Sequence, residues 1–152
     1  MNRFRKLSAG LVMSLAGFSL LVGFFGCETT TNLVSSTHFS QNAYDTDKGL
    51  KDESLALIDK ATNRAPYSSA ATDVAALMQK IDSAIGAEKS RTKNQPTIGQ
   101  WQTIKSQLSH FFDLWKTKGT LSPAFVDEGK KQVGTLFDTL IATEGDKRAR
   151  GQ

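Results

Sequence analysis

The chain has 152 residues, 39% of them hydrophobic, a single cysteine and a formal net charge of +4 at pH 7. Three of its 19 Lys and Arg residues (Arg3, Arg5 and Lys6) stand at the start, so the other 16 face 15 Asp and Glu and leave a net charge of +1. This balance gives no basis for nucleic-acid binding, which depends on a surplus of cations. The length after this first segment suits one domain.

The first 27 residues have the layout of a secretory signal. The basic start is followed by an uncharged, mostly apolar run, Leu11–Gly26, and then directly by Cys27. This segment resembles the type II signal peptide of bacterial lipoproteins. Cys27 matches the cysteine that is lipidated in that class, and Gly26 matches the small residue before it. Phe24 and Phe25 depart from the usual pattern, which has Leu and then a small residue at these two positions.

The resemblance implies that the signal peptide, residues 1–26, is removed and that acyl chains such as palmitate are attached to Cys27. More than one chain gives a durable anchor, because each buried CH₂ contributes about 0.8 kcal/mol and one chain holds only marginally. Glu28 is not the Asp that retains members of this class at the inner membrane, so we expect outer-membrane sorting if the host has one. The alternative is an uncleaved signal anchor, since residues 7–26 form an uncharged run of bilayer-spanning length.

Residues 27–38 are predicted to form a flexible tether, because Thr, Ser and Asn dominate them. From Phe39 to about Asn63, apolar and small side chains recur near every 3.6 residues, which predicts a first helix. A second helix is predicted to start at a cap formed by Thr72 or an earlier serine. Its expected core stripe consists of Val74, Leu77, Met78, Ile81 and Ile85.

A third helix is predicted from about Thr97 to Lys118, with Gly119 as its natural stop. Its stripe holds Trp101, Ile104, Leu108, Phe111, Phe112 and Trp115. The fourth helix is predicted to open with Ser122 as N-cap and Pro123 in the first turn, and to end at Gly145. Its expected core residues are Phe125, Val126, Val133, Leu136, Phe137, Leu140 and Ile141.

These segments predict an all-α fold, an up-down-up-down four-helix bundle over residues 39–145, preceded by the signal helix and tether. Residues 146–152 are then a short basic tail. Helical stripes of this kind suffice for one hydrophobic core, and no alternating β pattern competes with them.

Residues with chemical potential are few. His110 is expected to face solvent, and its pairing with Asp113 on one helix cannot close a metal site. The segment Asp45–Gly49 begins like a calcium loop, but its glycine comes one position early and Ala56 stands where the closing Glu belongs. Phosphate-binding loops, nucleophile elbows and covalent haem motifs are absent from the sequence. We therefore predict no catalytic residue, no metal and no cofactor.

Trp101, Phe112 and Trp115 share one stripe and either fill the core or line a pocket for an apolar ligand. We expect a non-catalytic, membrane-tethered lipoprotein on the extracytoplasmic face, held by lipid on Cys27. Its helical domain is expected to bind a partner protein or envelope component. The alternative is a carrier that holds a small apolar ligand within the bundle.

Overall fold

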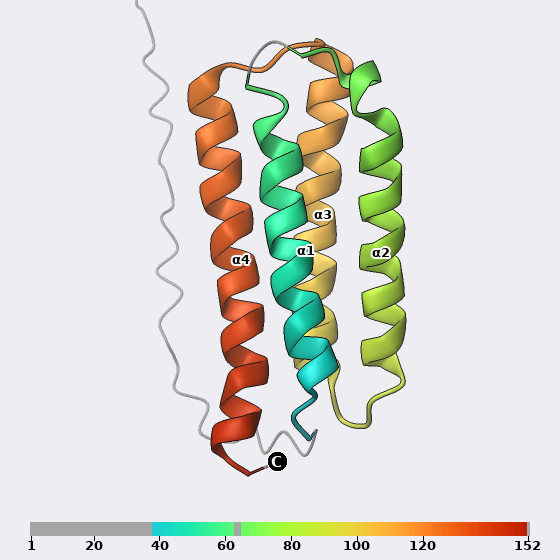
Figure 1. Cartoon of the computed structure of the whole chain (residues 1–152), viewed down its shortest axis with the longest axis vertical. Coiled ribbons are helices and arrows are strands. Elements are labelled where there is room, and N and C mark those ends of the chain that lie inside the picture. The colour runs from blue at the N-terminus through green and yellow to red at the C-terminus, as the bar shows by residue number, and fades with distance from the viewer. Residues whose placement is uncertain (1–37, 63–64, 152) are drawn as a thin grey trace, which may run out of the picture. The chain divides into compact units, whose positions relative to one another are not determined.

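The computed structural model describes residues 38–62 and 65–151, and this part of the chain is helical and contains no strand. Its elements are α1 (Gln41–Asp59), a 3₁₀ turn η1 (Tyr67–Ser69), α2 (Ala71–Lys89), α3 (Gln95–Lys118) and α4 (Pro123–Ala149). Figure 1 shows the four α-helices lying side by side. Helix α1 packs against α4 and α2, and α3 packs against the same two helices. The predicted all-α class with four helices is confirmed.

Among the described residues, no helix is both long enough and apolar enough to cross a membrane.

Three helix ends follow from capping chemistry. The Ser122 side chain accepts a hydrogen bond from the Phe125 backbone N–H at 3.3 Å, and Pro123 follows in the first turn of α4, as predicted. Gly119 ends α3 with a φ of 75°, and its N–H donates to the Trp115 carbonyl at 2.8 Å. A positive φ of this size is readily available only to glycine. Ser40 caps α1 by accepting from the Ala43 N–H at 3.2 Å.

Other helix ends differ from the sequence prediction. The expected cap at Thr72 is wrong, because α2 begins at Ala71 directly after η1, and no side chain caps it. The nearest serine, Ser69, instead donates its hydroxyl to the Pro66 carbonyl at 2.8 Å. Helix α3 begins at Gln95, earlier than expected, because a proline is tolerated in the first turn of a helix. Helix α1 ends at Asp59 rather than near Asn63.

The prediction that Gly145 ends the last helix is also wrong, since α4 continues to Ala149. Glycine within a helix costs only about 1 kcal/mol relative to alanine, which packing and hydrogen bonds can offset. Lys147, expected in the basic tail, is 1% exposed and donates hydrogen bonds to the side chains of Asn94 and Thr97. The segment 146–149 is therefore part of α4.

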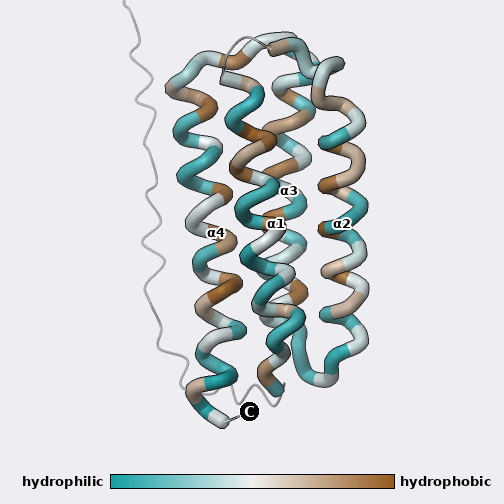
Figure 2. The backbone as a smooth tube through the Cα atoms, viewed as in Figure 1, coloured by the Kyte–Doolittle hydropathy of each residue, from teal (hydrophilic) through white to brown (hydrophobic). Residues whose placement is uncertain are grey.

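The core consists of the apolar stripes and is richest in aromatic rings on α3 and α4. Trp101 and Phe137 are fully buried and meet edge to face with ring centres 5.6 Å apart. Trp115, also fully buried, meets Tyr67 in the same way and donates its indole N–H to the Ala65 carbonyl at 3.0 Å. Figure 2 shows hydrophobic positions recurring along each helix between hydrophilic ones.

One predicted core residue lies outside the core. Phe125 is 40% exposed, because it stands in the first turn of α4, where few neighbours surround it. Its ring stacks on Phe111 with centres 5.8 Å apart. Phe111 in turn lies so close to Gly129 that a Cβ there would come within 2.8 Å of the ring. Met78, Leu136 and Ile141 are only partly buried.

Candidate functional site

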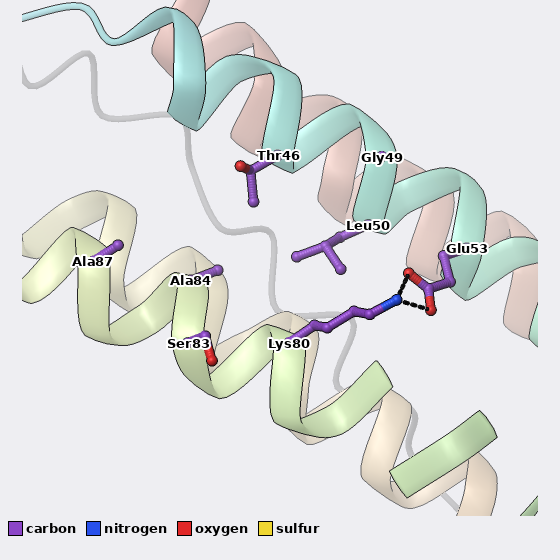
Figure 3. Close-up of a pocket in the computed structure, with 8 residues that line it drawn as sticks. All are labelled: Thr46, Gly49, Leu50, Glu53, Lys80, Ser83, Ala84 and Ala87. Atoms are coloured by element: carbon purple, nitrogen blue, oxygen red, sulfur yellow. Dashed lines mark hydrogen bonds and ion pairs between the residues drawn. The ribbon is translucent and has the colours of Figure 1, made fainter. Parts of the chain in front are cut away.

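An open groove runs between α1 and α2. Its main part has a volume of about 500 Å³. We call this hollow the α1–α2 groove, and Figure 3 shows its lining: Thr46, Gly49, Leu50 and Glu53 from α1, and Lys80, Ser83, Ala84 and Ala87 from α2. Glycine, alanine and serine leave space where larger side chains would close the seam between the helices. The groove exists because the two helices present small residues to each other on their outer side.

A charged pair marks one end of this groove. The Lys80 ammonium donates to both Glu53 carboxylate oxygens, at 2.7 and 2.9 Å. Beyond it lies a second hollow of about 320 Å³, which shares Glu53 and Lys80 with the first and reaches the pair Lys60–Asp73. Both pairs are largely exposed, and such pairs typically contribute less than about 1 kcal/mol each. They therefore shape the surface more than they stabilise the fold.

At its other end the groove continues into a smaller hollow of about 140 Å³, which shares Thr46, Ala84 and Ala87 with it. We call this hollow the Asp47 pocket. Its lining residues are Ser40, Asn42, Ala43, Thr46, Asp47, Ala84, Ala87, Glu88 and Arg91. The Asp47 side chain borders the pocket although the residue is only 2% exposed overall.

The Asp47 pocket borders a buried group of charges contributed by three helices and a loop. We call this group the charge cluster: Asp47 on α1, Glu88 on α2, Arg91 in the following loop, and Glu144 and Lys147 on α4. Burying charges is costly unless each one is paired and hydrogen-bonded. The hydrogen-bond partners of each residue therefore show which charges are compensated within the cluster.

Four members of the cluster are well paired. The Arg91 guanidinium donates to Glu88 at 2.8 Å and to Glu144 at 2.7 Å. The Lys147 ammonium donates to Glu144 at 2.5 Å and also to the side-chain oxygens of Asn94, at 3.1 Å, and Thr97, at 3.3 Å. These bonds join α2, α3 and α4 at one buried centre.

The chain just before α1 is tied to the same centre. The Ser40 backbone N–H donates to a Glu144 carboxylate oxygen at 2.7 Å. The Arg91 guanidinium donates to the His38 carbonyl at 2.5 Å. The start of the described chain is thereby held against the end of α4.

Asp47 is the exception in this cluster. Its carboxyl makes no hydrogen bond or ion pair with any side chain or backbone group in the described part of the chain. Burial, and next the negative charges of Glu88 and Glu144, raise the pKa of Asp47 from 3.8 to about 7. The cations Lys147 and Arg91 act in the opposite direction and only partly offset these effects.

Glu144 and Arg91 show the opposite behaviour. Burial opposes ionisation of Glu144, but hydrogen bonds from Arg91, Lys147 and the Ser40 N–H outweigh it and hold the pKa of Glu144 below its usual value. Burial likewise opposes the charge on Arg91, yet its bonds to Glu144 and Glu88 keep the pKa of Arg91 above its usual value. These two groups stay charged across the physiological range.

The residues singled out from the sequence lie elsewhere. Cys27 is outside the described residues. Trp101, Phe112 and Trp115 are 0%, 3% and 0% exposed and lie within the core, away from the α1–α2 groove. His110 is exposed, as expected. Within residues 38–62 and 65–151, no three His, Cys, Asp or Glu residues are arranged to hold a metal ion.

Neither the α1–α2 groove nor the charge cluster was predicted from the sequence. A signal for the cluster was present, because Asp47 falls on the buried stripe of α1 between Ala43 and Leu50. Glu144 likewise follows the buried Leu140 by four residues on α4. A charged residue on an apolar stripe is the feature that could have revealed this centre.

Comparisons of the chain with protein-family models, with curated proteins and with solved structures give no match.

Proposed function

We propose that this protein is a lipid-anchored lipoprotein of the bacterial envelope whose helical domain binds a partner protein or another envelope component without catalysing a reaction. The α1–α2 groove carries this proposal, because it is an open hollow, lined mainly by small and apolar residues, on the outside of the domain. The lipid on Cys27 holds the domain on the extracytoplasmic face of the membrane, the outer membrane if the host has one.

The packing of the core favours partner binding over carriage of an apolar ligand. The rings of Trp101 and Trp115 are fully buried and make edge-to-face contacts with Phe137 and Tyr67 respectively. Phe112 makes such a contact with its neighbour Phe111. Rings that pack against one another leave little room for a ligand among them.

Partner binding also fits an up-down-up-down connectivity of the helices. This connectivity brings the start of α1, the end of α2, the start of α3 and the end of α4 together at one end of the bundle. The hydrogen bonds from Ser40 and Arg91 to Glu144 support it, as does the bond from Lys147 to Asn94. The α1–α2 groove then lies along the side of the bundle and opens at this end into the Asp47 pocket.

Gly49 supports close approach of a partner backbone to the groove. A Cβ built on Gly49 would meet nothing within 4 Å, so no contact inside the domain requires glycine there. Glycine in a helix interior is nevertheless less stable than alanine by about 1 kcal/mol. The same holds for Gly86 on α2, which does not line the groove and so provides a matched control.

Site-specific photo-cross-linking in intact cells tests the proposal. A photoreactive side chain at Ala87, in the groove, should give one adduct of defined mass, whereas the same side chain at the exposed Ala142 of α4 should not. Gly49→Trp should fill the groove and abolish the adduct, while Gly86→Trp should leave it unchanged. Equal cross-linking at Ala87 and Ala142, or an adduct that persists with Gly49→Trp, would reject the groove as the binding site.

A further inference from the structure

The Asp47 pocket contains an acceptor that nothing in the described chain satisfies. Asp47 is 2% exposed, borders the pocket and makes no hydrogen bond or ion pair with another described residue. Buried carboxyl groups are normally hydrogen-bonded, because leaving one without a donor costs about 1–3 kcal/mol when it is neutral and more when it is charged. The position therefore calls for a donor from outside the chain.

The charge cluster cannot supply that donor. The Arg91 guanidinium is occupied by Glu88, Glu144 and the His38 carbonyl. The Lys147 ammonium has three acceptors of its own, in Glu144, Asn94 and Thr97. Two cations thus serve two carboxylates, and the carboxyl of Asp47 is in excess. A ligand that completes the cluster would carry one positive charge.

The lining and the volume of the pocket indicate the chemistry and the size of the rest of that ligand. The alanines Ala43, Ala84 and Ala87 give the pocket apolar lining, and Ser40 and Thr46 also line it. Its volume of about 140 Å³ is equal to about five water molecules at their share of liquid volume. A slender alkyl chain ending in a compact cation fits these dimensions.

An ammonium group suits the pocket better than a guanidinium. It is a compact point charge with three donors on a flexible apolar stem, whereas a guanidinium is a wide planar fork. Arg91 already lines this small pocket, which leaves less room for a second planar guanidinium than for a compact ammonium. An ammonium group can donate to the Asp47 carboxyl through any of its three N–H groups.

We infer that the Asp47 pocket binds a primary alkylammonium group, namely a lysine side chain of the partner segment that lies in the α1–α2 groove. This inference rests on the proposed function for the source of the lysine, but the chemistry of the pocket does not depend on it. The groove and the pocket share the lining residues Thr46, Ala84 and Ala87. Because the two hollows adjoin, a segment lying in the groove can place a side chain in the pocket.

Titration of Asp47 links this binding to pH. In the empty pocket, burial and the charges of Glu88 and Glu144 hold the pKa of Asp47 at about 7, against the opposing effect of Lys147 and Arg91. An ammonium group beside the carboxyl favours its charged form and displaces the proton. Affinity for the ammonium group should therefore rise as the pH increases through about 7.

Binding of n-butylammonium to the full-length lipidated protein in detergent micelles tests the chemistry of the pocket. We expect saturable shifts of the Ala43, Ala84 and Ala87 methyl signals in NMR spectra at about pH 8.5, where Asp47 is ionised. Affinity should fall about tenfold or more in Asp47→Asn, which matches the loss of one charge-assisted hydrogen bond. Asp52→Asn, an exposed carboxyl on the same helix, should bind as the wild type does. Equal affinity in Asp47→Asn and wild type would overturn the inference.

Two further experiments distinguish an ammonium site from a general cation site, and a partner lysine from a free amine. Tetramethylammonium has the same charge but no N–H, so its binding with the same affinity would contradict an ammonium site. In cells, Asp47→Asn should weaken the cross-link from Ala87 if the partner supplies the lysine. An unchanged cross-link, with butylammonium binding lost, would overturn the partner lysine and leave a free amine as the ligand. If the wild type gives no cross-link at all, the proposed function fails, and the butylammonium titration still decides the chemistry of the pocket.

Discussion

Asp47 occupies a position on α1 where a helix in a bundle would normally carry an apolar side chain. It lies on the buried stripe with Ala43, Leu50 and Ser54, yet its carboxyl is unpaired in the described chain. An unpaired buried carboxyl lowers stability, and a strongly shifted pKa beside a cavity marks a candidate functional site. A charged residue at a core position is therefore more informative about function than the apolar residues around it.

The pKa of Asp47 predicts how stability depends on pH. In the unfolded chain the carboxyl ionises near 3.8, but in the folded domain it ionises at about 7. Its contribution to stability is thus fully present below about pH 4 and is lost as the pH rises through 7, because the folded state binds the proton more tightly. Asp47→Asn cannot ionise, so it should be more stable than the wild type by about 2–4 kcal/mol near pH 8.

Urea denaturation of both proteins near pH 5 and pH 8 measures this difference. Glu144, whose lowered pKa gives stability that is lost on acidification, is present in both proteins, so the comparison isolates Asp47 and its coupling to Glu144. Asp52→Asn should follow the wild type at both pH values. A stability difference between Asp47→Asn and wild type that does not grow from pH 5 to pH 8 would show that Asp47 is already paired, which would remove the basis for an ammonium site.

Two glycines should respond in opposite ways to a methyl group. At Gly129 a Cβ would lie 2.8 Å from the Phe111 ring, which is itself held by stacking on Phe125, so Gly129→Ala should destabilise the domain by about 1–3 kcal/mol. At Gly49 a Cβ meets nothing within 4 Å, so Gly49→Ala should raise stability by up to about 1 kcal/mol. Thermal and urea unfolding of the two variants check both signs, and similar effects at the two positions would contradict this account of the packing.

At the scale of the helices, the sequence predicted what depends on neighbours along the chain. The number of helices, the Ser122 cap of α4 and the Gly119 stop of α3 all follow from local rules and are confirmed. The end of α4 was predicted wrongly, because it depends on distant parts of the chain. The last turns of α4 persist beyond Gly145 because Lys147 bonds to Asn94 and Thr97 on the far side of the cluster.

The same reasoning explains why the candidate site was not predicted. The α1–α2 groove forms because small residues on α1 and α2, more than 30 positions apart in the chain, face each other across the seam. Periodicity assigns each of these residues to a face of its own helix but does not indicate which helix lies opposite. The aromatic stripe of α3 was recognised in the sequence because its residues lie within one helix.

Trp115 connects α3 to the segment between α1 and α2. It is fully buried, meets Tyr67 edge to face and donates to the Ala65 carbonyl at 3.0 Å. Trp115→Ala should therefore cost about 3–5 kcal/mol, since both the ring volume and the hydrogen bond are lost. Trp115→Phe keeps much of the volume and should cost less.

Urea titration of the ligand-free protein decides between packing and a ligand pocket at this position. A ring that faced an empty pocket would lose little on removal, so a cost for Trp115→Ala below about 1 kcal/mol would favour the apolar carrier. A cost of several kcal/mol, with no apolar molecule found by mass spectrometry in the purified protein, would favour partner binding through the surface groove.

At the scale of the whole molecule, the proposed anchor and the proposed binding surface depend on each other. Ten residues lie between Cys27 and His38, and the eleven steps from one to the other can span at most about 36–40 Å. His38 and Ser40 are bonded to Arg91 and Glu144, so an anchor at Cys27 would be joined to the domain at the end that contains the charge cluster. A partner of the Asp47 pocket must then be reachable within a short distance of the membrane.

Whether Cys27 is lipidated therefore determines how far from the membrane the Asp47 pocket can lie. Cys27 is the single cysteine of the chain and directly follows the apolar run, so we expect it to carry acyl chains and to form the mature N-terminus. Intact-mass measurement of the protein from the membrane fraction should show loss of residues 1–26 and the added mass of the lipid. Cys27→Ser removes the thiol that accepts the lipid, so this variant should keep residues 1–26 and carry no acyl chain. An unmodified Cys27 with residues 1–26 still attached would contradict the lipid anchor and would favour the uncleaved signal anchor. The partner would then have to be sought at the membrane that this anchor spans.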